Sequence, residues 1–274
     1  MQRPDTNELK KKAKETRKTI LKMLTEAGSG HTSGSLSLVE IIMSLYFYKM
    51  RHDPKRPGWD MRDRLVLSKG HGCSALYAIL AEAGYFPKGE LVTFRKFGTR
   101  LQGHPQIGLP GIEASTGSLG QGLSIANGMA LAARMDNKDI RVYCIMGDGE
   151  LNEGQVWEAA MTASHYNLDN ICGIVDFNKM QIDGWCCDVM KLEPLADKWR
   201  SFGWNVMECD GHSFEELMDT LDKAEKVKHK PTVILAHTIK GKGVSFIEND
   251  VRWHGIAPKK EELERALKEL DEKD

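Results

Sequence analysis

Residues 141–149 read RVYCIMGDG, a short β-favouring run that ends in a Gly-Asp-Gly turn. A similar run, ICGIVD at residues 171–176, is followed by Phe177 and Asn178, and two more lie at 205–208 and 232–236. Helix-like segments separate these runs at residues 154–165, 194–202 and 214–227. Strands that alternate with helices predict an α/β fold with one parallel sheet and helices on both of its faces.

The segment before these strands is expected to be largely helical. Leu9, Ile20 and Leu24 recur among charged residues over positions 7–26, which predicts an amphipathic helix. The run at residues 36–48 is apolar on most faces and predicts a buried helix, and another helix is expected after His71. No repeat or linker interrupts the chain, so we predict a single domain over residues 1–274 that closes with a charged amphipathic helix at 259–274.

The composition argues against several classes of partner. The 274 residues include 38 Lys and Arg against 39 Asp and Glu, so no net charge favours nucleic acid or an anionic membrane. Residues 1–17 lack the apolar stretch of a secretory signal, and no segment offers about 18 uninterrupted apolar residues. The six cysteines form no CxxC pair, which argues against a thiol-ligated zinc site. We expect a cytoplasmic protein without a nucleic-acid or membrane partner.

Polar side chains follow the first two of the quoted strands. Asp148 and Asn178 lie one strand–helix–strand unit apart, and the carboxyl ends of parallel strands meet at one edge of the sheet. Two oxygen ligands of this kind suit Mg²⁺ or Ca²⁺, which share their remaining positions with phosphate oxygens, water and carbonyls. Gly147 and Gly149 allow the backbone to approach a diphosphate. A bare GDG is more often only a turn, but the strand on each side favours a site.

A glycine-rich loop and four loop histidines add to this candidate site. The loop TGSLGQG at residues 116–122 precedes a helical run, and its order of glycines differs from the dinucleotide fingerprint, so a nicotinamide site is weakly supported. Each of the four histidines has a glycine neighbour, and they are His31, His71, His104 and His254. One such histidine is more often an ordinary surface residue. As a set they suit proton transfers near neutral pH.

Taken together, these motifs resemble the transketolases. The stretch GDGELNEGQVWEAA at residues 147–160 is similar to the family's form of the thiamine diphosphate motif. The family's order is also followed by SGH at 29–31, LSKGH at 67–71, GHP at 103–105, TGSLGQG at 116–122 and WHG at 253–255. The resemblance implies a fold that binds thiamine diphosphate through Mg²⁺, Ca²⁺ or Mn²⁺. It also implies transfer of a two-carbon ketol unit between sugar phosphates, as in the pentose phosphate pathway.

The resemblance implies roles for individual residues around the cofactor. Asp148 and Asn178 would bind the metal through their side chains, and Met180 would bind it through its carbonyl. Asn178 and Gly149 would lie at the diphosphate with His71, while Gly117 and Leu119 would follow the aminopyrimidine ring. His237 follows a predicted strand and is a further candidate for the diphosphate site.

The resemblance also implies roles in catalysis and assembly. His31 and His254 would contact the hydroxyl and carbonyl region of the donor sugar, and His104 would contact its terminal hydroxyl. Glu153 and Glu158 would join an acidic network at a subunit interface. The competing interpretation is that both glutamates are ordinary exposed helix carboxylates.

Two parts of a transketolase have no counterpart in this sequence. The family takes the glutamate that activates thiamine diphosphate, and the arginines that hold the sugar phosphate, from a separate pyrimidine-binding domain. We therefore expect a complementary subunit that carries this domain, and an α₂β₂ assembly. The alternative is a truncated or inactive chain.

Two other functions stay open. One is a thiamine-dependent synthase of the deoxyxylulose-phosphate-synthase type, although ELNE at residues 150–153 and HG at 254–255 favour ketol transfer. The other is a non-catalytic module in which cofactor binding serves assembly alone.

Overall fold

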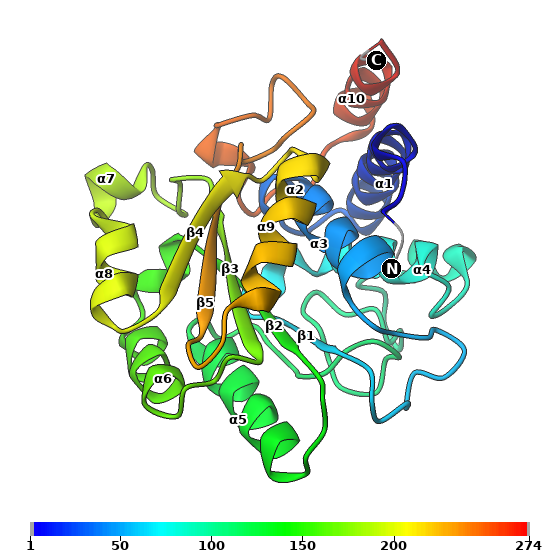
Figure 1. The fold of residues 1–274 in the computed structure, drawn as a ribbon. Coiled ribbons are helices and arrows are strands. Elements are labelled where there is room, and N and C mark those ends of the chain that lie inside the picture. The colour runs from blue at the N-terminus through cyan, green and yellow to red at the C-terminus, as the bar shows by residue number, and fades with distance from the viewer. Residues whose placement is uncertain (1–2, 273–274) are drawn as a thin grey trace.

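A computed structural model describes residues 3–272, and its centre is a five-stranded parallel sheet in the order β1-β2-β3-β5-β4 (Figure 1). The strands are β1 Arg64–Leu67, β2 Val142–Gly147, β3 Ile171–Phe177, β4 Asn205–Asp210 and β5 Thr232–His237. Gly147 of β2 is in register with Asp176 of β3, and Phe177 of β3 is in register with His237 of β5. The loops after β2, β3 and β5 therefore leave the sheet at one edge.

The sheet contains one strand that the sequence pattern missed. We expected four strands, and the structure adds β1, which pairs with β2 from Arg64↔Val142 to Leu67↔Ile145. This strand has only four residues, RLVL, and its neighbours are charged or glycine-rich, so its pattern is too short to distinguish from a loop. The strand is important for the site because the segment that follows it contains Lys69 and His71.

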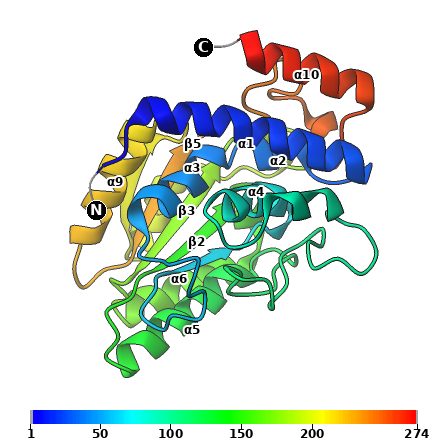
Figure 2. The same cartoon turned by 90° about the vertical axis from the view of Figure 1, so that its right-hand side faces the viewer.

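Side chains of β2 alternate between two apolar cores, one on each face of the sheet. Tyr143 and Ile145 belong to the core that contains α1 Thr6–Ala27, α3 Val39–Ser44, α4 Cys73–Glu82 and α9 Phe214–Lys226. Cys144 and Met146 belong to the core that contains α5 Gln121–Met135, α6 Gly154–His165 and α8 Leu195–Ser201. Figure 2 shows helices on both sides of the sheet, which confirms the predicted α/β architecture.

The first helix follows the sequence prediction closely. Asp5 caps α1 by accepting a hydrogen bond from the Asn7 amide at 2.9 Å, and Gly28 ends it with a φ of 63°. The buried run at 36–48 is not one helix, as we expected. It is divided among α2 Thr32–Leu36, α3 and the π-helical turn η1 Leu45–Lys49. The apolar pattern predicted burial correctly, but tertiary packing determined where each helix ends.

The last helix, α10 Lys260–Glu272, packs beside α1, with Ala266 and Leu270 buried (Figure 2). The remaining short elements are η2 Gly70–Gly72, η3 Lys88–Thr93, η4 Gly149–Asn152, α7 Cys186–Val189 and η5 Val251–Trp253. Across residues 3–272, no helix combines the length and the apolar character that a membrane crossing requires.

Candidate functional site

A cavity of about 400 Å³ lies at the carboxyl edge of the sheet, beside the loops that follow β1, β2 and β3. Most of the residues singled out in the sequence line it: His31, His71, His104, Gly117, Leu119, Asp148, Gly149, Glu153, Asn178, Met180 and His254. They come from segments spread over more than two hundred positions, and the parallel sheet brings them together. Gly34 of α2 and Lys69, in the loop after β1, also line the cavity.

Asp148 and Asn178 are anchored where β2 and β3 end. The Asp148 carboxylate is 1% exposed and accepts hydrogen bonds from the Gly149 amide at 2.7 Å and from the Lys179 amide. The side-chain oxygen of Asn178 accepts from the Met180 amide at 3.1 Å. Adjacent strand ends therefore hold the carboxylate and the amide at one place, as predicted.

The donor set around Asp148 fits a hard divalent cation. Burial, and then the charge of Asp176, raise the pKa of Asp148 to about 7, so this carboxylate lacks full compensation for its charge. The Asn178 amide oxygen and the Met180 carbonyl are the other oxygen donors, and oxygen ligands are what Mg²⁺ and Ca²⁺ prefer. Within residues 3–272, no cluster of three or more His, Cys, Asp or Glu side chains is arranged to hold a metal. A site here would depend on a single carboxylate.

Four imidazole rings lie close together among the residues that line the cavity. The centroid of the His31 ring lies 5.0 Å from that of His71, 5.5 Å from that of His254 and 6.3 Å from that of His104. Burial lowers the pKa of His31 to about 4 and that of His254 to about 3, with further lowering from neighbouring cationic groups. Burial, followed by the charge of Lys69, also lowers the pKa of His71. These rings are therefore neutral at pH 7 and act as hydrogen-bonding groups.

Two lysines that the sequence analysis did not single out contribute positive charge. The ammonium group of Lys69 donates to Asp176 at 2.6 Å and to the Gly34 carbonyl at 3.3 Å. Lys240, in the loop after β5, donates to the Met180 carbonyl at 3.2 Å and to Nδ1 of His254 at 2.9 Å. Burial, and then the charge of Lys69, lower the pKa of Lys240 to about 8. The only sequence signals were their positions beside motif glycines, in SKGH and TIKGKG.

The bond to Lys240 determines the tautomer of His254. An ammonium group can only donate, so Nδ1 of His254 is an acceptor, and the proton of the neutral ring lies on Nε2. Nδ1 of His31 is buried and has no hydrogen-bond partner within the described part of the chain. A buried polar atom without a partner is typical of a site that a ligand completes.

A buried glutamate, also missed in the sequence, holds the glycine loops. One carboxylate oxygen of Glu150 accepts from the Gly120 amide at 2.9 Å and from the Ser68 hydroxyl, and the other accepts from the Gly147 amide at 2.9 Å. Gly120 has a φ of 83°, a conformation that favours glycine. Glu150 thus connects the ends of β1 and β2 to the loop at 117–122.

Two predicted residues lie away from this cavity. His237, at the end of β5, pairs with Glu208 at 2.8 Å and is partly exposed to solvent. Glu158 is exposed on α6 and does not line the cavity, whereas Glu153 is among the lining residues. The interface role of both glutamates stays a prediction.

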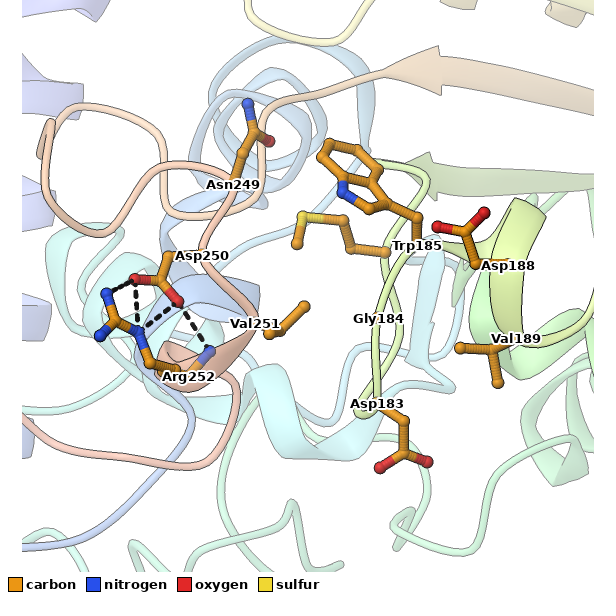
Figure 3. A pocket seen from close by; sticks show the side chains of 10 residues that line it. Asp183, Gly184, Trp185, Asp188, Val189, Asn249, Asp250, Val251 and Arg252 are labelled. Carbon is orange, nitrogen blue, oxygen red and sulfur yellow. Dashed lines mark hydrogen bonds and ion pairs between the residues drawn. The ribbon is translucent and has the colours of Figure 1, made fainter.

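A second, more open hollow of about 540 Å³ adjoins the cavity at Met180 (Figure 3). Asp183, Trp185 and Val189 line one side of it. Asp250 and Arg252 line the other, and Figure 3 shows the contacts between them, the shortest of which is 2.5 Å. Met180 lines both hollows, and the segment at 181–184 runs from the cavity into the second hollow.

Comparison with known proteins identifies the family. A family model described as the transketolase thiamine diphosphate-binding domain matches residues 9–272. The chain belongs to the transketolase family. The motifs at 29–31, 67–71, 147–160 and 253–255 all lie within the matched range, so the resemblance predicted from the sequence is confirmed.

Some transketolase relatives have nearly the same length as this chain. It is 48% identical to the 6-deoxy-6-sulfo-D-fructose transketolase subunit SqwG of a Clostridium species, over 96% of each chain. It is 42% identical to one of the subunits of the apulose-4-phosphate transketolase of Phocaeicola vulgatus, over 97% of this chain and 94% of that one. Both relatives carry names that describe them as subunits.

Solved transketolases confirm the fold. The enzyme from Campylobacter jejuni superposes with a TM-score of 0.91 at 33% identity, over 96% of this chain and 42% of that one. The enzyme from Leishmania mexicana gives a TM-score of 0.90 at 31% identity, over 96% and 41%. The chain thus spans about two fifths of the length of these solved transketolases.

Proposed function

We propose that this chain is the thiamine diphosphate-binding subunit of a two-chain transketolase, which transfers a two-carbon ketol unit from a ketose phosphate to an aldose phosphate. The observation that carries the proposal is the cavity at the sheet edge. Asp148, Asn178 and Met180 line this cavity together with the imidazoles of His31, His71 and His254. One cavity therefore combines side chains suited to bind a metal diphosphate with side chains suited to bind a sugar.

Asp148, Asn178 and the Met180 carbonyl are the residues that would hold the divalent cation, with Mg²⁺ as the expected ion. Gly149 and the ammonium groups of Lys69 and Lys240 supply donors and positive charge for the diphosphate oxygens. When bound, thiamine diphosphate supplies the carbon nucleophile of the reaction. The protein contributes orientation, charge and proton transfer.

The neutral histidines provide the polar contacts for the sugar. His254 presents Nε2–H as a donor because Lys240 occupies its Nδ1. His31 and His104 lie beside it, and their low pKa values keep the rings neutral, so each ring can accept a hydrogen bond from a hydroxyl group. Burial, and then the charge of Arg95, lower the pKa of His104.

A partner chain with the pyrimidine-binding domain completes the proposed enzyme, in an α₂β₂ assembly with Glu153 and Glu158 at an interface. Two observations support this. The chain covers almost all of the relatives described as subunits, and only about two fifths of the solved transketolases. A single cofactor-binding domain over the whole chain, and a cytoplasmic location, stay predictions from the sequence.

The substrates are a finer proposal. The similar subunits have names that refer to 6-deoxy-6-sulfo-D-fructose and to apulose 4-phosphate, so specialised sugars deserve testing beside those of the pentose phosphate pathway. The arginines that bind the phosphate of the sugar are expected on the partner. A panel of substrates must therefore be tested with the two-chain enzyme.

The first experiment measures binding of thiamine diphosphate to the full chain by isothermal titration calorimetry, with and without MgCl₂. We expect binding that depends on Mg²⁺ in the native chain, and none in the Asp148→Ala variant. Binding that persists unchanged in the variant would refute the metal assignment.

The second experiment adds a candidate partner chain and follows ketol transfer from a ketose phosphate. Activity only in the mixture supports the two-chain enzyme. Full activity of this chain alone would contradict the need for a partner. Cofactor binding without turnover in any mixture would instead indicate a non-catalytic module.

A further inference from the structure

A buried charged cluster outside the cavity contains Arg17, Glu40 and His212. The guanidinium group of Arg17 donates to both carboxylate oxygens of Glu40, at 2.6 and 2.7 Å. Nδ1 of His212 lies 3.0 Å from the same carboxylate. Arg17 and Glu40 are only 6% and 5% exposed. The three side chains come from α1, α3 and the turn before α9, and none of them lines the cavity.

This cluster forms hydrogen bonds to the backbone at both ends of residues 239–242. Nε2 of His212 accepts a hydrogen bond from the Ile239 amide at 2.8 Å, and Nε of Arg17 donates to the Lys242 carbonyl at 2.9 Å. Because Nε2 of His212 is an acceptor, its proton lies on Nδ1 and points to Glu40. Glu40 therefore fixes the ring orientation that lets His212 bind the loop.

Lys240 and Gly241, the two residues between these anchors, also form backbone hydrogen bonds. The Lys240 carbonyl accepts from the Asn249 amide at 2.8 Å, and the Gly241 amide donates to the Ser33 carbonyl at 2.9 Å. Gly241 has a φ of 84°, and a Cβ there would lie 2.6 Å from the Ile247 carbonyl oxygen. Four consecutive residues thus each have an anchor, and the buried cluster supplies the first and the last.

The side chain of Lys240 leaves this segment and enters the cavity, where it contacts the Met180 carbonyl and His254. A lysine side chain is flexible, and holding its ammonium group in a largely buried position costs conformational entropy and desolvation. A rigid backbone beneath it lowers the entropic part of that cost. This is the physical reason for anchoring the segment at every residue.

We propose that His212, oriented by the Arg17–Glu40 pair, is a positioning residue for Lys240. Through Lys240 it sets the tautomer of His254 and the affinity of the cavity for a metal diphosphate. The effect on affinity for a metal diphosphate rests on the proposed function, whereas the effect on the tautomer of His254 does not. The competing explanation is that the cluster only stabilises the fold.

The test compares two substitutions at His212. His212→Phe keeps a ring of similar size but removes both hydrogen bonds. His212→Gln keeps one acceptor and one donor that are spaced like the two ring nitrogens, so it should restore the link from Glu40 to Ile239. His165→Phe, on an exposed histidine at the end of α6, is the matched control.

The first readout needs no ligand. In full-length protein labelled with ¹⁵N-histidine, NMR shifts report which ring nitrogen of His254 carries the proton. We expect the Nε2–H form in the native protein, in His212→Gln and in the control. We expect a mixture of tautomers in His212→Phe and in Lys240→Met. An unchanged His254 tautomer in His212→Phe would overturn the proposal.

The second readout is a double-mutant cycle on the affinity for thiamine diphosphate in MgCl₂. We expect His212→Phe to weaken cofactor binding about tenfold, which corresponds to the loss of about one hydrogen bond between a misplaced Lys240 and the bound cofactor. The same change should have almost no effect in a Lys240→Met background, because the two residues act in one chain of contacts. An equal loss in both backgrounds, with a lower melting temperature, would mean a structural role only. If thiamine diphosphate binds neither to the native chain nor to its mixture with a partner chain, while the tautomer change is observed, the proposed function is refuted and the positioning role stands.

Discussion

Lys69 and Asp176 form an ion pair of 2.6 Å directly beside the cavity, with side chains that are only 3% and 0% exposed. Ser37 also donates to Asp176, at 2.7 Å. Burial alone would raise the pKa of Asp176, but the charge and hydrogen bond of Lys69 outweigh it and lower the pKa. The pair comes from the end of β3 and the loop after β1, so it joins two non-adjacent strands.

Lys69→Met should leave the Asp176 charge buried without a counter-ion. Removal of one partner of a buried pair destabilises a protein by about 3–5 kcal/mol, so we expect a loss of that order. Urea denaturation followed by circular dichroism measures it. Lys96→Met, in an exposed pair with Glu26, is the control and should change the midpoint little. Equal midpoints for the two variants would show that the buried pair adds nothing.

Asp148→Asn should remove a pH dependence of stability. The folded pKa of about 7 exceeds that of an ordinary aspartate, so the native state binds more protons than the unfolded state between these values. The contribution of Asp148 to stability is therefore present at low pH and lost as the pH rises to about 7. Without metal, Asp148→Asn should gain stability relative to the native chain between pH 5 and pH 8. Melting temperatures across this range, with and without MgCl₂, check it.

The effect of Mg²⁺ on the same melting temperatures provides a second check. Mg²⁺ should stabilise the native chain most at pH 8, where Asp148 is ionised, and should have no specific effect on Asp148→Asn. A difference between variant and native chain that stays constant from pH 5 to pH 8 would show that Asp148 has an ordinary pKa.

Lys240→Met should raise the pKa of His254. Burial is the largest cause of the low value, and the charge of Lys240 is the next. Removal of the charge should therefore move the pKa upward from about 3, while burial keeps it below the ordinary value. An NMR titration of the His254 ring measures this change. Lys179→Met, at an exposed lysine, is the matched control and should leave the titration unchanged.

Glu150→Gln should loosen the loop at 117–122. The carboxylate accepts from the Gly120 and Gly147 amides and from Ser68, and an amide group replaces one acceptor by a donor. A buried donor without an acceptor costs about 1–3 kcal/mol, and we expect a loss of stability in that range. Urea denaturation measures it, with the exposed Glu261→Gln as control. A midpoint equal to that of the control would refute the role of Glu150.

The pattern of apolar runs predicted the α/β class and four of the five strands, because β2, β3, β4 and β5 are separated by helices of clear periodicity. It missed β1, which has too few residues to show a period. It also predicted one helix over 36–48, where the structure has three short pieces that pack against α1, α4 and α9. Local patterns report burial well, but they do not report where tertiary contacts end an element.

For the site, too, the sequence predicted some of the residues and missed others. Glycine-flanked histidines and the polar residues after strand ends were visible in the sequence, and His31, His71, Asp148 and Asn178 do line one cavity. Lys69, Lys240 and Glu150 were not singled out, because charged residues are frequent along the chain and only their burial distinguishes them. His237 had the expected position at a strand end, but it pairs with Glu208 away from the cavity.

Periodicity and motifs along the chain were enough to predict the layered fold, the family and the polar groups at the strand ends. They did not show which charged and polar side chains are buried together, as Lys69 is with Asp176 and Arg17 is with Glu40 and His212. The physical reason is that the burial of a charge depends on contacts between segments far apart in the sequence. Those contacts exist only once the sheet has brought the segments to one edge.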